Sequence, residues 1–154
     1  MLTKDGAFYK IKYVKSTHLD AIDTLLKKEL TKKERIFFPH NKESILKYLT
    51  TGKDYYYVVE SYYENAVAYG HMRTFDGKYN IPSLGIAVGK NARGYGIGKI
   101  LCEHMIKDMK RKGYKEVMLK VNNQNRKALK LYLGLGFVMY NWDSDFIWMH
   151  KKLL

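Results

Sequence analysis

The feature that most constrains the fold is a glycine-rich segment, residues 93–98 (RGYGIG), between an apolar run and a long amphipathic segment. The apolar run, residues 83–88, is typical of a strand covered on both faces. Over residues 96–112 apolar side chains recur at every fourth position, which predicts a helix that Gly113 closes as a C-cap. A strand at residues 117–121 follows, so the region predicts a βαβ unit with parallel strands and a right-handed crossover.

Apolar periodicity and turn residues assign the other elements. Strands are expected at residues 7–14, 54–62, 66–75, 137–142 and 146–152, and helices at residues 18–30, 42–51 and 125–136. Thr17 with Asp20 resembles a capping box for the first helix, and Gly52 ends the second. Without an internal repeat or linker, residues 1–154 predict a single α/β domain with an open mixed sheet.

The glycine-rich segment lies where open sheets bind ligands, at the carboxyl end of a strand and the start of a helix. Alternate glycines permit positive φ and close backbone approach, and the first amides of a helix favour an anion. The segment therefore predicts a phosphate or pyrophosphate site. A dinucleotide fingerprint would need glycine at Lys99, and a P-loop would need glycine at Arg93 and Ser or Thr at Ile100. A glycine-rich turn without a ligand is the alternative.

Charge and composition limit the partners. Lys and Arg number 28 against 15 Asp and Glu, and the net charge of +13 favours an anionic partner such as nucleic acid, a membrane surface or a phosphorylated small molecule. Only five of these cations are arginine, the residue favoured for reading bases and phosphates, so the nucleic-acid interpretation is weakened. A lysine-rich surface that keeps the protein soluble is the alternative.

The lone Cys102 excludes an intramolecular disulfide and any multi-cysteine zinc site, and no metal is expected. Its predicted place is the core, without a role as an acyl carrier. No signal peptide is evident, and no stretch approaches the ~20 apolar residues of a spanning helix. A cytoplasmic protein without a membrane partner is therefore expected.

Two motifs in the chain resemble segments of one known family. RGYGIG after the strand SLGIAV resembles the Arg/Gln-x-x-Gly-x-Gly/Ala pyrophosphate loop of the GCN5-related N-acetyltransferases, and residues 125–137 (NRKALKLYLGLGF) resemble their Asn-x-x-Ala-x-x-Leu-Tyr-x-x-x-Gly-Phe segment. The resemblance covers residues 84–137. It implies the acyl-CoA N-acyltransferase fold, a mixed sheet of six to seven strands with about four helices. The implied activity is transfer of the acetyl group of acetyl-CoA to a primary amine of a small molecule or peptide.

The resemblance also implies roles for individual residues. The implied cofactor-binding residues are Arg93, Gly94, Tyr95, Gly96, Ile97 and Gly98 around the pyrophosphate, Ile86, Ala87 and Val88 along the pantetheine arm, and Asn125. A splay between this strand and residues 117–121 would admit the pantetheine, and an amide near Ile86 or Ala87 would polarise the thioester carbonyl. Tyr132 would protonate the departing thiolate, with core packing as its alternative role.

The general base is not assigned by the motifs. In the peptide N-terminal branch of the family a glutamate often lies five residues before the asparagine, where this chain has Lys120. Glu60, Asp76 and Tyr79 lie near the predicted central hairpin. We take His71 as the candidate base because histidine titrates near neutral pH. A hydrogen-bonded strand histidine without a catalytic role is the alternative. Arg73 and residues 55–57 could line the acceptor site.

Two other classes of function stay open. The charge also suits a nucleic-acid or ribosome-associated protein, and the motifs also suit a domain that binds acyl-CoA without catalysis. The C-terminal strands, residues 137–154, could pair between two subunits of a homodimer.

Overall fold

The structure is a computed structural model that describes residues 8–30, 41–75 and 77–154. Its helices and strands are β1 Tyr9–Tyr13, α1 Leu19–Glu29, α3 Lys42–Thr51, β2 Tyr55–Ser61, β3 Ala68–Arg73, β4 Ser83–Val88, α4 Ile97–Arg111, β5 Glu116–Asn122, α5 Arg126–Gly134, β6 Val138–Trp142 and β7 Phe146–Lys152. Within these described ranges no helix has the length and apolar character needed to cross a membrane. The predicted elements are confirmed, with ends that shift by one or two residues in most of them.

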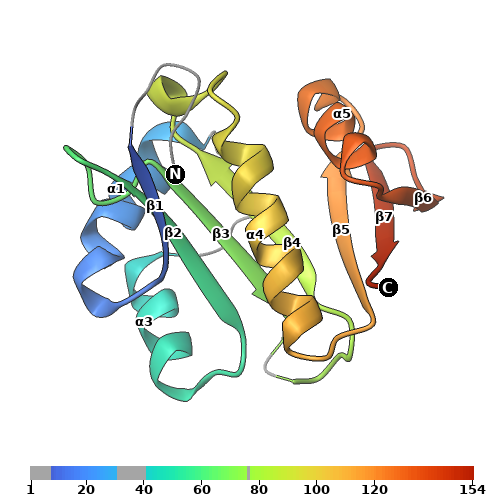
Figure 1. Ribbon diagram of the computed structural model, residues 1–154, viewed down its shortest axis with the longest axis horizontal. Coiled ribbons are helices and arrows are strands. Elements are labelled where there is room, and N and C mark those ends of the chain that lie inside the picture. Colours follow the sequence, from blue (N-terminus) through green and yellow to red (C-terminus); the bar gives the residue numbers. More distant parts are fainter. Residues whose placement is uncertain (1–7, 31–40, 76) are drawn as a thin grey trace.

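The strands form one seven-stranded sheet in the order β1-β2-β3-β4-β5-β7-β6. Every neighbouring pair is antiparallel except β4 and β5, which are parallel and joined through α4. The predicted βαβ unit and the mixed α/β class are therefore confirmed. Figure 1 shows α4 crossing one face of the sheet over β3 and β4, with α1 and α3 behind the opposite face.

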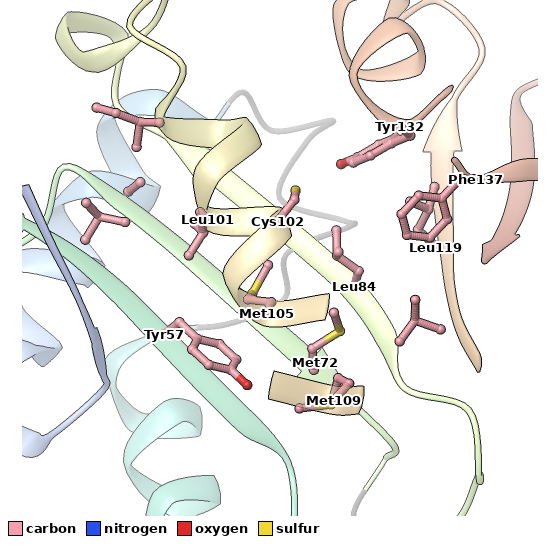
Figure 2. Packing of buried hydrophobic residues seen from close by; sticks show 14 of the residues in the cluster. Tyr57, Met72, Leu84, Leu101, Cys102, Met105, Met109, Leu119, Tyr132 and Phe137 are labelled. Atoms are coloured by element: carbon pink, nitrogen blue, oxygen red, sulfur yellow. The ribbon is translucent and has the colours of Figure 1, made fainter. Parts of the chain in front are cut away.

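Two buried clusters fix these layers. On the α4 and α5 side the core includes Tyr57, Met72, Leu84, Leu101, Cys102, Met105, Met109, Leu119, Tyr132 and Phe137 (Figure 2). On the α1 and α3 side it includes Leu19, Ile22, Leu26, Ile45, Tyr56, Val58, Tyr69 and Ala87. Neighbouring residues of β2 and β3 alternate between the two clusters, because successive side chains of a strand point to opposite faces.

The start of α1 differs from the prediction. Thr17 lies within a 3-10 turn, Ser16–His18, and α1 begins behind His18 without a side-chain cap. The His18 ring replaces the expected capping box, since its Nδ1 accepts from the Lys15 amide at 2.9 Å and its Nε2 lies 2.7 Å from Glu60 Oε1. A contact with β2, which is distant in sequence, therefore decides how the helix begins.

The sheet opens between β4 and β5. These two strands share a single registered pair, Ser83 with Met118, and the Met118 amide donates to the carbonyl of Pro82 at 2.9 Å. In contrast, all seven residues of β5 are in register with β7. Figure 1 shows β4 and β5 diverging from this lower contact toward the N-terminal end of α4. The predicted splay is thus part of the fold.

Candidate active site

The glycine-rich loop leaves main-chain amides open at the upper end of this splay. Gly94 and Gly96 have φ of 85° and 83°, in the left-handed region that favours glycine. A Cβ built on either would meet no atom within 4 Å, so the space above both is open. Gly96 is the N-cap of α4 and supplies no side-chain hydrogen bond to its first amides. Uncapped amides and the helix dipole together form a site that suits a pyrophosphate.

The side chains of the loop take different positions. Arg93 folds back so that its Nε donates to the carbonyl of Val88 at 3.0 Å, and its Nη2 lies 3.8 Å from Glu29. Tyr95 is 37% exposed, whereas Ile97 is buried in the core and can offer a ligand only its amide. A Cβ on Gly98 would lie 3.5 Å from Val88 Cγ2, an ordinary packing distance, so α4 lies close to β4 at this residue.

Main-chain groups of β4 alternate between its two neighbours. The amide of Gly89 donates to Val67, next to β3, at 2.8 Å, while Pro82 bonds to β5. The amide and the carbonyl of one residue point to the same side of a strand, and successive residues alternate between the two sides. Ile86 and Val88 therefore present their amides toward the splay. Ala87 pairs in register with Tyr69, and its amide points toward β3.

Tyr132 occupies the opposite wall of the splay. Its side chain is 7% exposed, and its ring packs against Phe137 at a centroid distance of 5.9 Å. Figure 2 shows the hydroxyl extending from α5 toward Cys102 of α4. No described residue hydrogen-bonds this hydroxyl. Burial, with a smaller effect of Cys102, raises the pKa of Tyr132, so the phenol stays protonated at neutral pH.

Cys102 is buried in the core, as predicted. Burial raises the pKa of its thiol to about 12, with a smaller effect of Glu103. A thiol with such a pKa is almost entirely un-ionised at neutral pH, and the thiolate is the nucleophilic form. The predicted lack of an acyl-carrier role therefore has a physical basis.

His71 lies over β4 at the lower part of the splay. It pairs in register with Gly85, and a Cβ on Gly85 would collide with Nε2 and Cε1 of the imidazole. The missing side chain at position 85 is therefore what makes room for the ring. His71 is 7% exposed and lies on the face of the sheet that carries α1 and α3.

The other residues considered as bases lie elsewhere or are already engaged. Glu60 is bound by Lys12 and His18, each at 2.7 Å, and the hydrogen bond from Lys12 is the main cause that lowers its pKa. Tyr79 is 54% exposed. Asp76 lies outside the described residues. Among the described candidates, His71 alone borders the splay.

Asn125 begins α5, as predicted, and its Oδ1 accepts from the Ala128 amide at 3.2 Å. The side chain is thus a helix cap, and its contact with the pantetheine stays a prediction.

Two surface hollows lie away from the splay. One of about 590 Å³ separates β1 from α4, with His104 and Lys107 in its lining. The other, of about 700 Å³, lies between α1 and the turn from β2 to β3. The loop, the splay and Tyr132 therefore form the candidate active site by their own geometry.

Sequence reasoning missed two features, one on β4 and one on α4. Gly85 interrupts an apolar strand, and an isolated glycine in a strand is a signal of close approach by another group. Asp108 lies at a core-facing position of α4 and accepts hydrogen bonds from Tyr13 and Tyr57, both at 2.6 Å. A carboxylate within the apolar stripe of a helix could have indicated this buried cluster.

Comparisons with known proteins identify the family and the fold of this chain. A family model described as "Acetyltransferase (GNAT) family" matches residues 19–137. Mycothiol acetyltransferase of Paenarthrobacter aurescens (strain TC1) is 40% identical over 68 residues, which cover 42% of this chain and 20% of that protein. N-alpha-acetyltransferase 30 of Saccharomyces cerevisiae (strain ATCC 204508 / S288c) is 43% identical over 53 residues, which cover 34% of this chain and 30% of that protein.

The chain thus spans less than a third of the length of these two relatives. A solved structure, the GNAT superfamily phosphinothricin acetyltransferase from Sinorhizobium meliloti in complex with AcCoA, shares the fold with a TM-score of 0.78 and 18% identity. That comparison covers 94% of this chain and 88% of the other. The predicted family and fold are confirmed. Because the family match covers most of the sequence, the chain belongs to the acetyltransferase (GNAT) family.

Proposed function

We propose that the chain is an acetyl-CoA-dependent N-acetyltransferase that acts on a primary amine of a small molecule or peptide. The observation that carries this proposal is the splay between β4 and β5, which ends at the uncapped amides of α4. Membership of the acetyltransferase family and the likeness to an AcCoA complex support it. The similarity to an N-alpha-acetyltransferase supports an amine as the acceptor.

The loop and β4 would hold the two parts of the cofactor. Amides of residues 94–99 bind the pyrophosphate, where the left-handed Gly94 and Gly96 leave open space. The carbonyl of Ile86 and the amide of Val88, which face the splay, pair with the pantetheine, as an added strand would. Asn125, at the start of α5, lies beside the pantetheine arm. Acetyl-CoA supplies an activated acetyl group in this position.

Three groups of the chain would carry the chemistry. His71 accepts the proton of the attacking amine, and the amide of Ile86 stabilises the negative charge that develops on the carbonyl oxygen. Tyr132 donates its proton to the sulfur as the carbon–sulfur bond breaks. The raised pKa of Tyr132 suits a proton donor that must stay protonated at neutral pH. The products are an N-acetyl amine and CoA with a free thiol.

The state of Cys102 supports direct attack within a ternary complex. A buried thiol with a pKa of about 12 does not take up the acetyl group at neutral pH. Release of CoA from acetyl-CoA is measured with varied concentrations of both substrates over a panel of amines. We expect intersecting initial-rate lines and full activity of Cys102→Ala. Parallel lines with an inactive Cys102→Ala protein would overturn direct attack.

The base is tested separately with His71→Asn. We expect the rate of the variant to fall most at pH values below the pKa of the acceptor amine, where a base is needed to take up the proton of the amine. Cofactor binding should be retained. If His71→Asn keeps the wild-type pH profile, the base is another group. A protein that binds acetyl-CoA and acetylates no amine in the panel would refute the proposed function in favour of acyl-CoA binding alone.

We also propose that β6 forms a homodimer interface with a second copy of the chain. β6 is an edge strand, and all five of its residues are exposed. Val138, Met139 and Trp142 are 54%, 52% and 66% exposed, respectively. Pairing of two such edges across a twofold axis would extend the sheet and cover apolar surface. Light scattering should give twice the monomer mass, and Met139→Lys with Trp142→Lys should give the monomer.

A further inference from the structure

Arg73 presents an arginine fork on the same face of the sheet as His71. It is the last residue of β3, and its Cζ lies 5.2 Å from the ring centroid of Tyr48 and 4.8 Å from that of Phe75. Cation–π contacts on two rings hold the guanidinium plane in place. Only 13% of the side chain is exposed. A fixed planar fork loses little entropy when it binds a planar anion.

The backbone next to Arg73 is shaped for this contact. Phe75 has a φ of 54°, the left-handed region that a bulky residue rarely adopts. Such a conformation is strained and persists only where the surroundings impose it. In this structure it carries the aromatic ring to Arg73 and to Tyr79, at a centroid distance of 5.5 Å from the latter.

The nearest described carboxylate, Asp54, pairs with Nε of Arg73 and leaves the two terminal nitrogens without a contact. Asp54 Oδ1 accepts from the amide of Thr74 at 2.7 Å and from its hydroxyl at 2.9 Å. Asp54 Oδ2 lies 3.5 Å from Nε of Arg73, at the limit of a hydrogen bond. Among the described residues none accepts a hydrogen bond from the two terminal nitrogens of Arg73. The fork therefore keeps its two outer donors for a ligand.

The strand register places Arg73 beside the reacting groups. His71 and Arg73 are two positions apart on β3, so their Cα atoms lie roughly 6.6 Å apart on one face. Their partners on β4 are Gly85 and Ser83, and Ser83 pairs onward with Met118 of β5. An acceptor whose nitrogen lies near His71 and Gly85 can therefore reach Arg73 along β3.

A second cation borders the same face from β5. Lys120 Nζ lies 4.2 Å from the ring centroid of Phe146 and 5.2 Å from that of Trp148. Lys120 follows Met118 by two positions on β5, so the two side chains point to the same face of the sheet. Met118 pairs with Ser83 at the closed end of the splay, and Lys120 is the next residue on that face. The nearby Glu116 is hydrogen-bonded to His150. Cations therefore lie on both sides of the splay, Arg73 beside Asp54 and Lys120 within electrostatic range of Asp143.

We infer that the acceptor amine carries an oxyanion, a carboxylate or a phosphate, and that Arg73 binds it. This inference rests on the proposed function and adds the chemical class of its substrate. Two parallel N–H donors on one fork match the two oxygens of either group, with charge-assisted hydrogen bonds. The spacing of His71 and Arg73 favours an oxyanion several bonds from the nitrogen. Lys120 adds long-range attraction for the same charge.

The test uses matched amines that differ only in charge. CoA release is measured with ω-amino carboxylates of increasing chain length against the corresponding ω-amino amides, and with O-phosphoethanolamine against ethanolamine. We expect the anionic member of at least one pair to have the higher kcat/KM, by tenfold or more. The chain-length series locates the preferred separation, and the two pairs distinguish carboxylate from phosphate.

Variants of Arg73 then assign the effect to this residue. Arg73→Gln should raise KM for the anionic amine about tenfold to a hundredfold with little change in kcat, because the contact is made equally before and during reaction. KM for the neutral partner should not move. Arg73→Lys should recover part of the loss, since it keeps the charge but not the fork. Lys110→Gln, an exposed charge at the far end of α4, is the control.

Binding provides a readout that does not need turnover. Calorimetric titration of the anionic amine into CoA-loaded protein should show Arg73-dependent affinity even if no amine is acetylated, and that result would refute the proposed activity alone. Equal or better use of the neutral or cationic amines, or an Arg73→Gln protein with unchanged KM and affinity, would overturn the oxyanion inference while leaving acetyl transfer in place.

Discussion

The two ends of helix α4 differ in whether their polar groups are hydrogen-bonded within the fold. At the N-terminal end, Gly96 gives no side-chain cap and the space above the loop is open. Toward the C-terminal end, the carboxylate of Asp108 accepts from Tyr13 and Tyr57 at 2.6 Å and from Arg111 at 2.7 Å. One end leaves donors for a ligand, whereas the other uses its acceptors within the fold.

Two buried tyrosines show the same difference. Burial raises the pKa of both Tyr57 and Tyr132, and for Tyr57 the hydrogen bond to Asp108 adds to the effect. The Tyr57 hydroxyl is hydrogen-bonded, and the Tyr132 hydroxyl has no hydrogen-bond partner among the described residues. A similar burial therefore serves stability in one case and leaves a proton donor available in the other.

The largest expected effect comes from Tyr132→Phe. Loss of the proton donor should lower kcat about 100-fold or more near neutral pH, with the affinity for acetyl-CoA retained. Stability should change little, because the hydroxyl makes no hydrogen bond within the described structure. Steady-state kinetics and calorimetric titration of CoA check both parts.

Tyr57→Phe is the matched substitution at the other end of α4. It should keep kcat and lower the free energy of unfolding by about 1–2 kcal/mol, since Asp108 loses one donor. Equal kcat for Tyr132→Phe and wild type would remove Tyr132 from the chemistry and end the distinction between the two tyrosines.

Asp108→Asn tests only the C-terminal end of α4, where the polar groups are hydrogen-bonded within the fold. Burial pushes the pKa of Asp108 up, but hydrogen bonds from Tyr13, Tyr57 and Arg111 outweigh it and hold the pKa below its ordinary value. The carboxylate therefore contributes stability above the unfolded-state pKa of about 4, and this contribution is lost as pH falls through the lower folded-state pKa. At neutral pH the substitution should cost about 2–4 kcal/mol.

Denaturant unfolding at several pH values measures this contribution. Wild type should lose stability more steeply than Asp108→Asn below about pH 4, so the two curves should converge in acid. The exposed Glu103→Gln on the same helix is the control and should follow wild type. A constant difference between wild type and Asp108→Asn across pH would show that the carboxylate charge is not what stabilises this end.

A modest effect on stability and a sharper one on binding are expected from two glycines. Gly96 and Gly113 flank α4 with φ of 83° and 89°, and a Cβ on either would meet no atom within 4 Å. Alanine at each position should therefore cost a similar 1–2 kcal/mol or so of backbone strain. Only Gly96→Ala should also weaken CoA binding, by about tenfold, because its methyl group enters the space above the loop.

Thermal unfolding and CoA titration of both variants separate strain from ligand contact. If Gly113→Ala weakened CoA binding as much as Gly96→Ala, the effect would be a general response to strain in α4, and the loop would lose its special role.

Local patterns predicted the elements whose ends are set by nearby residues. Helix α3 has the predicted bounds, because Asn41 caps it and Gly52 ends it. Helix α1 was misjudged at its start, since His18 is held by Glu60 of β2 rather than by its own turn. The β7 position between β5 and β6 was likewise not foreseen, because the chain order of strands does not give their spatial order.

The candidate site divides in the same way. The loop, the Asn125 cap and the path from strand to helix depend on contiguous residues, so the motifs could locate them. The placement of His71 over Gly85 depends on the register of β3 with β4. Arg73 was noted only as a residue that could line the acceptor site, because its contacts with Tyr48, Phe75 and Asp54 join segments that no periodicity connects.

The weak pairing of β4 with β5 has a consequence for the order of events during synthesis. One registered pair ties β5 to β4, whereas seven tie it to β7, which the ribosome makes later. A single domain folds as a unit. Because β5 pairs over its whole length with β7, the second wall of the binding groove is complete only when β7 is available to the folding chain. A chain that stops before β7 should therefore lack a closed groove for its ligand.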